Sequence, residues 1–308
     1  MTAQNTIEEP EEEGNLFRDI TPLRRFIIDF SASKVAVVGL CMIVTIILIA
    51  IFAPLLSVQN PYDLGQLDIM DGRLPPGEVG GMGFTFWLGS DDQGRDMLSG
   101  IFYGLRTSLG VGAMSAFIAL IIGSSFGLLA AYYGGRVDSI IMRIVDIQLS
   151  FPAVLLALVL LAILGKGVDK IIVALVAVQW AYYARTVRGT ALVERRKEYM
   201  EAAKCLALSH KRIVFRHLLP NCMPPLIVVV TVQVAHAISL EATLSFLGIG
   251  LPVTEPSLGL LIANGFEYML SGKYWISFFP GIALLLTIVS INLVGDQLRD
   301  VLNPRLQK

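Results

Sequence analysis

Six long apolar runs constrain the fold of this chain more than any other feature of its sequence. They occupy residues 35–56, 107–133, 139–164, 171–187, 222–247 and 274–293. About 20 mainly apolar residues suffice for a helix to cross a bilayer. The strands of a membrane barrel would instead alternate polar and apolar residues, whereas this chain is 55% hydrophobic and only 16% charged. The sequence therefore predicts an all-α integral membrane protein with about six transmembrane helices.

The distribution of Lys and Arg predicts which loops face the cytoplasm. Residues 185–216 contain nine of them, whereas residues 57–104 contain only two beside seven acidic residues. Because cytoplasmic loops carry an excess of Lys and Arg, we expect residues 188–220 on the cytoplasmic side and residues 57–106 in an external loop. An even number of spans then places both termini in the cytoplasm.

The limits of the apolar runs divide the chain into three parts. Residues 1–34 are predicted to form a cytoplasmic acidic tail and a pre-membrane segment, residues 35–298 the transmembrane domain, and residues 299–308 a cytoplasmic tail. No small-residue cleavage site follows the first apolar run, so this run is predicted to be a retained signal-anchor helix rather than a cleaved signal peptide.

Small residues crowd the second apolar run. They are Gly110, Gly112, Ala113, Ser115, Ala116, Gly123, Ser124, Ser125 and Gly127. Small residues allow two helix backbones to approach closely in a membrane. We therefore expect this helix to pack inside the bundle or against a second subunit.

The stretch EYMEAAKCLALSHKRIVFRHLLPN, residues 198–221, is a basic and helix-forming island between two apolar runs. Good helix formers up to Leu206, a potential N-cap at Ser209 and a helix-stopping Pro220 predict two short helices with a tight corner. Glu201 would offer a charge to a cytosolic partner, while Ala202 and Ala203 would form a low surface. The alternative is an ordinary cytoplasmic loop that fixes the topology or touches anionic lipid.

Glu241 is the most unusual charge, because it lies near the outer end of an apolar run. A carboxylate inside a membrane usually faces the bundle interior or a water-filled path, so Glu241 is a candidate for the translocation path. The alternative is a Glu241 near the interface that bonds the bent backbone around Gly248. Arg143 and Asp146 lie three residues apart, which predicts a structural ion pair on one helix face.

Residue types that form catalytic, metal or phosphate sites in other proteins are scattered in this chain. Cys41, Cys205 and Cys222 form no CxxC pair, and no phosphate-binding GxxxxGK[ST] loop is present. Asp91, Asp92 and Asp96 lack EF-hand spacing and are predicted to be structural residues of a glycine-bent loop. The sequence therefore predicts no catalytic residue, no metal site and no cofactor in this chain. The net charge of −1 gives no indication of nucleic-acid binding.

Several motifs together resemble a known family. The basic island contains Glu201-Ala202-Ala203 and Leu219-Pro220, with Ala207 where the family motif has Gly. Further matching segments are LGSDDQGRDMLSG at 88–100, AYYGGRVDSIIMRIVD at 131–146, EATLSFLGIG at 241–250 and NLVGDQLRDVLNPRL at 292–306. The chain resembles the C-type permease of ABC importers in the dipeptide/oligopeptide/nickel subfamily. An Ala at 207 is expected to fit a tight corner but not a positive φ angle.

This resemblance implies a type I ABC importer permease fold with a cytoplasmic coupling loop, in a bacterial inner membrane. The implied coupling residues are Glu201, Ala202, Ala203, Ala207, Ser209, Leu219 and Pro220. The implied partners are a B-type permease, one or two cytoplasmic ATPase subunits that bind ATP and Mg, and an external substrate-binding protein. The implied cargo is di- or oligopeptides, with nickel, glutathione, opines or oligosaccharides as alternatives.

Two other classes of protein stay open at this point. A stand-alone secondary transporter would need an internal repeat and buried coupling charges, and Glu241 with His236 is its only candidate relay. A membrane enzyme would need a cluster of His, Cys or carboxylates at the membrane surface.

Overall fold

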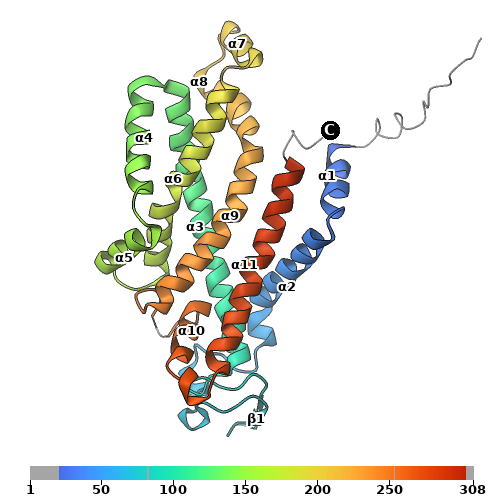
Figure 1. The fold of residues 1–308 in the computed structure, drawn as a ribbon, viewed down its shortest axis with the longest axis vertical. Helices are drawn as coiled ribbons and strands as arrows, with labels where there is room; N and C mark the ends of the chain where they lie inside the picture. Colours follow the sequence, from blue (N-terminus) through green and yellow to red (C-terminus); the bar gives the residue numbers. More distant parts are fainter. Residues whose placement is uncertain (1–20, 82, 253, 303–308) are drawn as a thin grey trace, which may run out of the picture.

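The computed structural model describes residues 21–81, 83–252 and 254–302 (Figure 1). Residues 1–20 of the predicted tail and pre-membrane segment at 1–34, and residues 303–308 of the predicted C-terminal tail, lie outside this range. The helices are α1 (Pro22–Ser31), α2 (Lys34–Leu56), α3 (Met97–Tyr133), α4 (Gly135–Leu149), α5 (Ala153–Leu164), α6 (Val168–Glu194), α7 (Glu198–Cys205), α8 (His210–Arg212), α9 (Leu219–Phe246), α10 (Leu258–Phe266) and α11 (Trp275–Leu302). The two short strands β1 (Glu78–Val79) and β2 (Thr85–Phe86) pair in an antiparallel hairpin.

Four helices among the described residues are long and apolar enough to cross a membrane. They are α2, α3, the helical run His210–Phe246 that ends in α9, and α11. The helices α4 and α5 meet this requirement only as a pair, and they are bent by 93°. The predicted span at 171–187 lies in α6, which has 27 residues but is less apolar than the others. The fold is therefore mainly helical, as predicted. By length and composition alone, the described residues contain four apolar spans, or five with the bent pair, and α6 covers the remaining predicted span without meeting the same test.

The expected single helix at 139–164 is wrong, because it is broken between α4 and α5. The break falls at Ser150 and Phe151, and Pro152 caps the start of α5. A proline lacks the backbone N–H that would continue a helix, and it disfavours the helical conformation of the residue before it. One proline therefore changes a predicted straight span into a bent pair.

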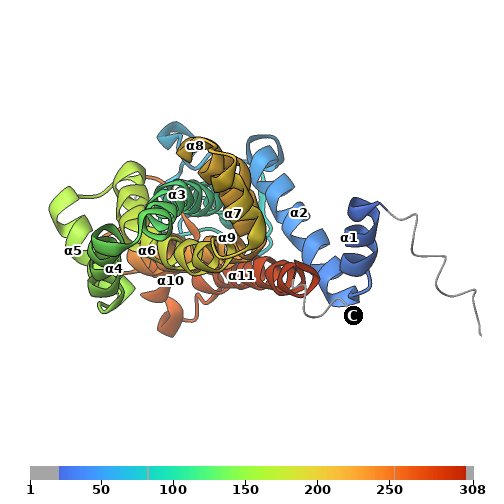
Figure 2. The ribbon, with the colours of Figure 1, turned by 90° about the horizontal axis from the view of Figure 1, so that it is seen from above.

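The helix α3 lies at the centre of the bundle, between α6 and α9 on one side and α2 on the other (Figure 2). It begins at Met97, ten residues before the predicted start, because the Asp96 side chain caps it by accepting a hydrogen bond from Ser99 N at 2.8 Å. A Cβ atom at Gly123 would lie 2.3 Å from the Trp180 carbonyl oxygen of α6, and one at Gly127 would lie 2.5 Å from that of Ala184. Packing inside the bundle is thus confirmed for these glycines.

Other small residues of α3 lie elsewhere. Gly112, Ser115, Ala116 and Ser124 are also buried, whereas Gly110, Ala113 and Ser125 are exposed. The prediction of inward packing therefore holds for one face of the helix only.

The two ends of the molecule differ in structure (Figure 1). The short helices α7 and α8 project at one end, where the start of α1 and the end of α11 also lie. The hairpin β1–β2 and α10 lie at the other end. The basic island and both described chain ends thus share one end of the bundle, as the charge distribution requires.

The glycine-bent loop at the opposite end is held by its own aspartates. Asp91 Oδ1 accepts hydrogen bonds from Gln93 N at 2.8 Å and from Arg95 N at 2.9 Å. The loop turns at Gly89 and Gly94, which have φ angles of 81° and 76°. The structural interpretation of this motif is therefore confirmed.

The corner after α7 has the geometry of a Schellman motif. Leu208 N donates to Ala203 O at 3.3 Å, Ala207 N donates to Lys204 O at 2.9 Å, and Ala207 has a φ angle of +50°. These two bonds satisfy carbonyl groups at the end of α7. They require a left-handed backbone conformation at the residue after the C-cap, which is Ala207. The expectation that Ala207 avoids a positive φ angle is therefore wrong, since the closing bonds outweigh the strain.

Pro220 does not stop the second helix of the island. The chain runs as one helical segment from His210 to Phe246, and Pro220 lies in the first turn of α9. A π-helical turn, Ile213–Leu218, comes directly before it. The wider turn accommodates a residue that lacks an N–H and whose ring crowds the carbonyl four residues earlier. The island is thus one helix, α7, followed by the extension of α9.

Replacing Ala207 by Gly should stabilise the corner. A non-glycine residue in the left-handed region costs about 1 kcal/mol, so Ala207→Gly should slow hydrogen exchange of the closing amides about fivefold. Ala202→Gly, in the middle of α7, is the matched control and should speed exchange, because glycine costs about 1 kcal/mol inside a helix. Faster exchange in both variants would contradict the strained corner.

The outer loop should lose stability as the pH rises. Burial raises the pKa of Asp91 from 3.8 to about 6. The folded state therefore favours the protonated carboxyl, and its stabilising contribution is complete below about pH 4 and is lost as the pH rises through the folded pKa.

The size of this effect follows from the pKa difference, which corresponds to about 3 kcal/mol. Thermal unfolding or proteolysis of the loop at about pH 3.5 and about pH 7.5 measures the loss. Asp91→Asn should remove most of this pH dependence, whereas Asp63→Asn, at an exposed position in the same segment, should retain it. Equal pH dependence in Asp91→Asn and the wild type would contradict the assignment to Asp91.

Candidate coupling surface and membrane cavity

The inner face of α7 is anchored in a buried cluster at the end of the bundle. Met200 is fully buried and Ala203 is 4% exposed. They pack with Ile213, Leu218 and Cys222 against the ends of α3 and α6. Ala203 therefore belongs to the anchor and not to the outer surface, which corrects its expected role.

The outer face of α7 is exposed and chemically mixed. We define the coupling surface as the exposed residues of this face, which are Glu201, Ala202, Lys204, Cys205 and Leu206. Leu206 is 73% exposed, an unusual position for a large apolar side chain at a charged helix end. The coupling surface thus presents charges of both signs and one large apolar side chain at the tip of the projection.

The remaining predicted coupling residues lie at the base of this surface. Ser209 stands at the N-cap position of α8, but its side chain makes no capping hydrogen bond. Leu219 packs against the buried cluster, and Pro220 is exposed. The structure thus brings Glu201, Ala202 and Ala207 together at the tip and places Leu219 and Pro220 below them.

Polar contacts fix the coupling surface to the bundle. Glu194, at the end of α6, accepts hydrogen bonds from Lys197 Nζ at 2.6 Å and from Tyr199 Oη at 2.8 Å. Burial, together with the bond to Glu194, raises the pKa of Tyr199 to about 12. On the other side, His210 Nδ1 bonds the hydroxyl of Tyr132 in α3. Both ends of the island are therefore joined to the transmembrane helices.

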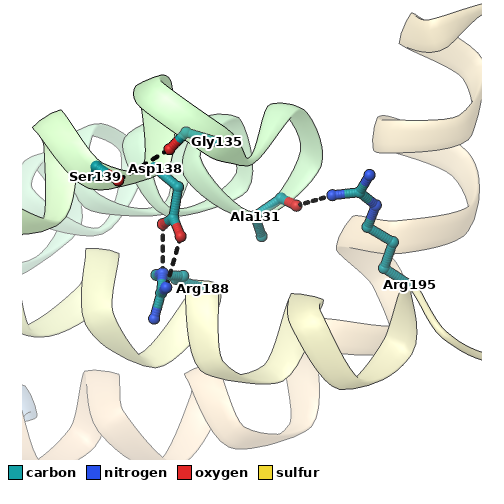
Figure 3. Close-up of polar contacts among 6 residues, drawn as sticks. All are labelled: Ala131, Gly135, Asp138, Ser139, Arg188 and Arg195. Carbon is teal, nitrogen blue, oxygen red and sulfur yellow. Dashed lines mark hydrogen bonds and ion pairs between the residues drawn. The ribbon is translucent and has the colours of Figure 1, made fainter.

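Ion pairs join α4 to α6 next to this anchor (Figure 3). The Arg188 guanidinium donates to both carboxylate oxygens of Asp138, at 2.5 and 2.6 Å, and Arg195 Nη1 donates to Ala131 O at 2.8 Å. Asp146 pairs with Arg185 of α6. The predicted pair of Arg143 with Asp146 is therefore wrong, because a partner on the facing helix replaces the one on the same helix.

A cavity of about 1380 Å³ lies between α1, α6, α9 and α11. Its charged lining residues carry both signs, and they are Arg25, Asp29, Arg185, Glu194, Asp296 and Arg299. Deeper in the bundle its wall includes Tyr182 of α6 and Val228, Val232 and Gln233 of α9. The cavity thus combines a charged region with an apolar wall that contains an amide.

Glu241 does not line this cavity. Its side chain is fully buried and accepts hydrogen bonds from Ser108 Oγ of α3 at 2.8 Å and from Ser245 Oγ at 2.7 Å. Ser108 Oγ in turn accepts a bond from Leu258 N at the start of α10, at 3.4 Å. Neither the path-facing role nor the expected bond to the backbone near Gly248 is observed. Glu241 instead joins α3, α9 and α10.

Sequence reasoning missed the buried amides Gln179 and Gln233. They lie inside apolar stretches of α6 and α9 and are 0% and 6% exposed. Their position within apolar runs was a usable signal, but only charged residues such as Glu241 were singled out by it. No group of three or more His, Cys, Asp or Glu that could hold a metal ion occurs in the ranges the structure describes.

Comparison with known proteins identifies the family of this architecture. Residues 123–308 match the model of the binding-protein-dependent transport system inner membrane component, and residues 21–76 match the N-terminal TM domain of oligopeptide transport permease C. The dipeptide transport system permease protein DppC of Alkalihalophilus pseudofirmus is 36% identical over 307 residues, which cover 100% of this chain and 97% of that protein.

Other relatives give the same result. The oligopeptide transport system permease protein OppC of Bacillus subtilis is 38% identical and covers 91% of this chain, with 88% of its own length aligned. The di/tripeptide transport system permease protein DppC of Pseudomonas aeruginosa is 38% identical over 93% of both chains.

The fold is also found in a solved structure. The MetNI methionine ABC transporter in an inward-facing conformation aligns with a TM-score of 0.54 at 21% identity, over 67% of this chain and 98% of that chain. The chain therefore belongs to the family of binding-protein-dependent transport system inner membrane components, and it is a permease of the C type.

Proposed function

We propose that this chain forms half of the translocation pathway of an ATP-driven importer of di- and oligopeptides in a bacterial inner membrane. The observation that carries this proposal is the coupling surface, which projects from the bundle yet is anchored to α3, α6 and α9. A rigidly held projection of this kind can transmit a force from a cytosolic partner to transmembrane helices.

The anchoring defines how the coupling would work. ATP-driven closure of two ATPase subunits would move α7, and the contacts of Met200, Glu194 and His210 would carry this movement into the bundle. Rigid-body rotation of packed helices is a common way to switch a pathway between two sides of a membrane. In this mechanism the chain itself is not catalytic.

The partners follow from this mechanism. A second, B-type permease would complete the pathway, one or two ATPase subunits would bind ATP and Mg, and an external binding protein would deliver cargo. The coupling surface and both termini would face the cytoplasm, since Lys and Arg gather at that end.

The relatives support peptides as the cargo, because they are named as dipeptide, di/tripeptide and oligopeptide permeases. A cavity lined by charges of both signs is compatible with a zwitterionic peptide. Nickel, glutathione, opines and oligosaccharides are the alternative cargoes of the same machinery. A stand-alone secondary transporter is the remoter alternative, and Glu241, its candidate coupling charge, lies outside the wall of this cavity.

Reversing the charge of Glu201 should uncouple transport. In the proposed complex the Glu201 carboxylate faces basic groups of the ATPase, and a Lys at this exposed position would repel them. Glu201→Lys should therefore lower ATP-driven peptide uptake about tenfold, equivalent to ~1.4 kcal/mol of docking free energy. Uptake into vesicles that contain the complete transporter measures the effect.

The matched control is Asp300→Lys. Asp300 is an exposed acidic residue at the same end of the bundle but on α11, away from the coupling surface. Its reversal should leave uptake within about twofold of the wild type, since isolated surface charges contribute little. Equal losses in the two variants, or normal uptake in Glu201→Lys, would contradict the docking role.

Purification should reveal the partners. The tagged chain, extracted from its native membrane in mild detergent, should retain a second permease and an ATPase with a phosphate-binding loop, both identified by mass spectrometry. Glu201→Lys should retain the second permease and lose the ATPase. Recovery of the wild-type chain alone, with uptake that ignores ATP and follows a proton gradient, would favour a secondary transporter.

A further inference from the structure

Four polar side chains form a cluster in the middle of the bundle. Gln179 and Tyr182 lie one turn apart on α6, and Gln233 and His236 lie one turn apart on α9. Gln179 Nε2 donates to the backbone oxygen of Gln233 at 3.5 Å, and the rings of Tyr182 and His236 are 6.4 Å apart. We call these four residues the amide cluster.

The amide cluster borders the cavity. Tyr182 and Gln233 both line its wall, and Tyr182 is 38% exposed. The adjoining wall is apolar, with Val229 and Val232 beside Gln233. The cluster is therefore the polar part of the wall at this depth of the described bundle.

Three atoms of the cluster are buried without a hydrogen-bond partner in the described structure. They are Gln179 Oε1, Gln233 Nε2 and His236 Nδ1. A buried polar group without a partner destabilises the fold. Polar side chains within membrane-spanning segments usually face the bundle interior or a water-filled path, and they often mark the route of a substrate or an ion.

Other polar side chains of the bundle have their hydrogen bonds within the chain. Gln148 of α4 is partly buried, and its Nε2 donates to the backbone oxygens of Ala177 and Val178 at 2.5 and 3.0 Å. Glu241 is likewise satisfied by serine hydroxyls. Among the described side chains with a buried unpaired atom, Gln233 lines the cavity, whereas Ser124, Tyr183 and Asn264 do not.

We propose that the amide cluster binds the backbone of the peptide as it passes along the cavity, with Gln233 as its central residue. This inference rests on the proposed function and names the contact that the cargo would make inside the membrane.

The chemistry of the glutamine amide suits this role. Its side chain carries one acceptor oxygen and two donor hydrogens, the same groups that each peptide bond presents as C=O and N–H. A small rotation of Gln233 would bring these groups to a peptide bond in the cavity. Because every peptide has this backbone, the contact would not depend on the side chains of the cargo, as an importer of mixed peptides requires.

Removal of the Gln233 amide tests the proposal. In vesicles with the complete transporter, Gln233→Leu should lower ATP-driven uptake of trialanine about tenfold, the loss expected for one well-formed hydrogen-bonded contact. The amount of chain in the membrane and its co-purification with the partner subunits should stay unchanged. Thr243→Val is the matched control, because Thr243 is an exposed polar residue of α9 outside the cavity wall, and its uptake should equal that of the wild type.

A photo-cross-linker tests the contact directly. Benzoylphenylalanine at Tyr182 should cross-link to radiolabelled trialanine during turnover, whereas benzoylphenylalanine at Phe117, which is 60% exposed on α3, should not. Cross-linking of position 182 to the second permease instead of the peptide would overturn the proposal, because a helix of that subunit would then occupy the cavity.

The remaining outcomes separate this inference from the proposed function. Normal uptake by Gln233→Leu in a transporter whose wild type imports trialanine would overturn the inference alone. No ATP-driven peptide uptake by the wild type would overturn the proposed function, and the inference with it.

Discussion

The close backbone contact between α3 and α6 is the constraint on which the rest of the structure depends. In lipid there is little hydrophobic drive to bring helices together, so association relies on van der Waals contact at small residues. Gly123 and Gly127 provide that contact, because any side chain there would strike the carbonyls of Trp180 and Ala184. The ends of these two helices then form part of the buried cluster into which Met200 and Ala203 of α7 pack.

The same contact explains how the coupling surface is anchored to the bundle. The island is tied to α6 through Glu194 and to α3 through Tyr132, and α4 is tied to α6 through Arg188 and Asp138. A displacement of α7 cannot be absorbed by a flexible loop, since its anchors lie on three helices. In the proposed mechanism it would be passed on to α3, α6 and α9, and α6 and α9 form part of the cavity wall.

The sequence predicted features that depend on composition and local pattern. The apolar runs indicated membrane helices, and the small residues of the second run indicated its central position. The motif around Glu201 indicated the helix that now carries the coupling surface. These predictions succeed because length, apolarity and residue size act within one segment, whatever its neighbours are.

The predictions that failed depend on partners that the sequence does not place. Asp146 pairs with Arg185 across two helices rather than with Arg143 on its own. Ala207 accepts a strained φ angle because Leu208 and Ala203 close a Schellman motif around it. Glu241 is caged by Ser108 and Ser245. Of these two serines, only Ser245, which lies four residues from Glu241 on the same helix, could have been predicted from sequence spacing.

Polar groups inside the bundle fall into two classes, and this division connects fold with function. Glu241 and Gln148 join helices, and their hydrogen bonds are made within the chain. Gln179, Gln233 and His236 retain unpaired atoms beside the cavity. In the proposed mechanism the satisfied groups hold the moving helices together, and an unsatisfied group in the cavity wall, such as Gln233, gains a partner from the cargo. The second class is therefore where the cargo should be sought, even though Glu241 carries the more conspicuous charge.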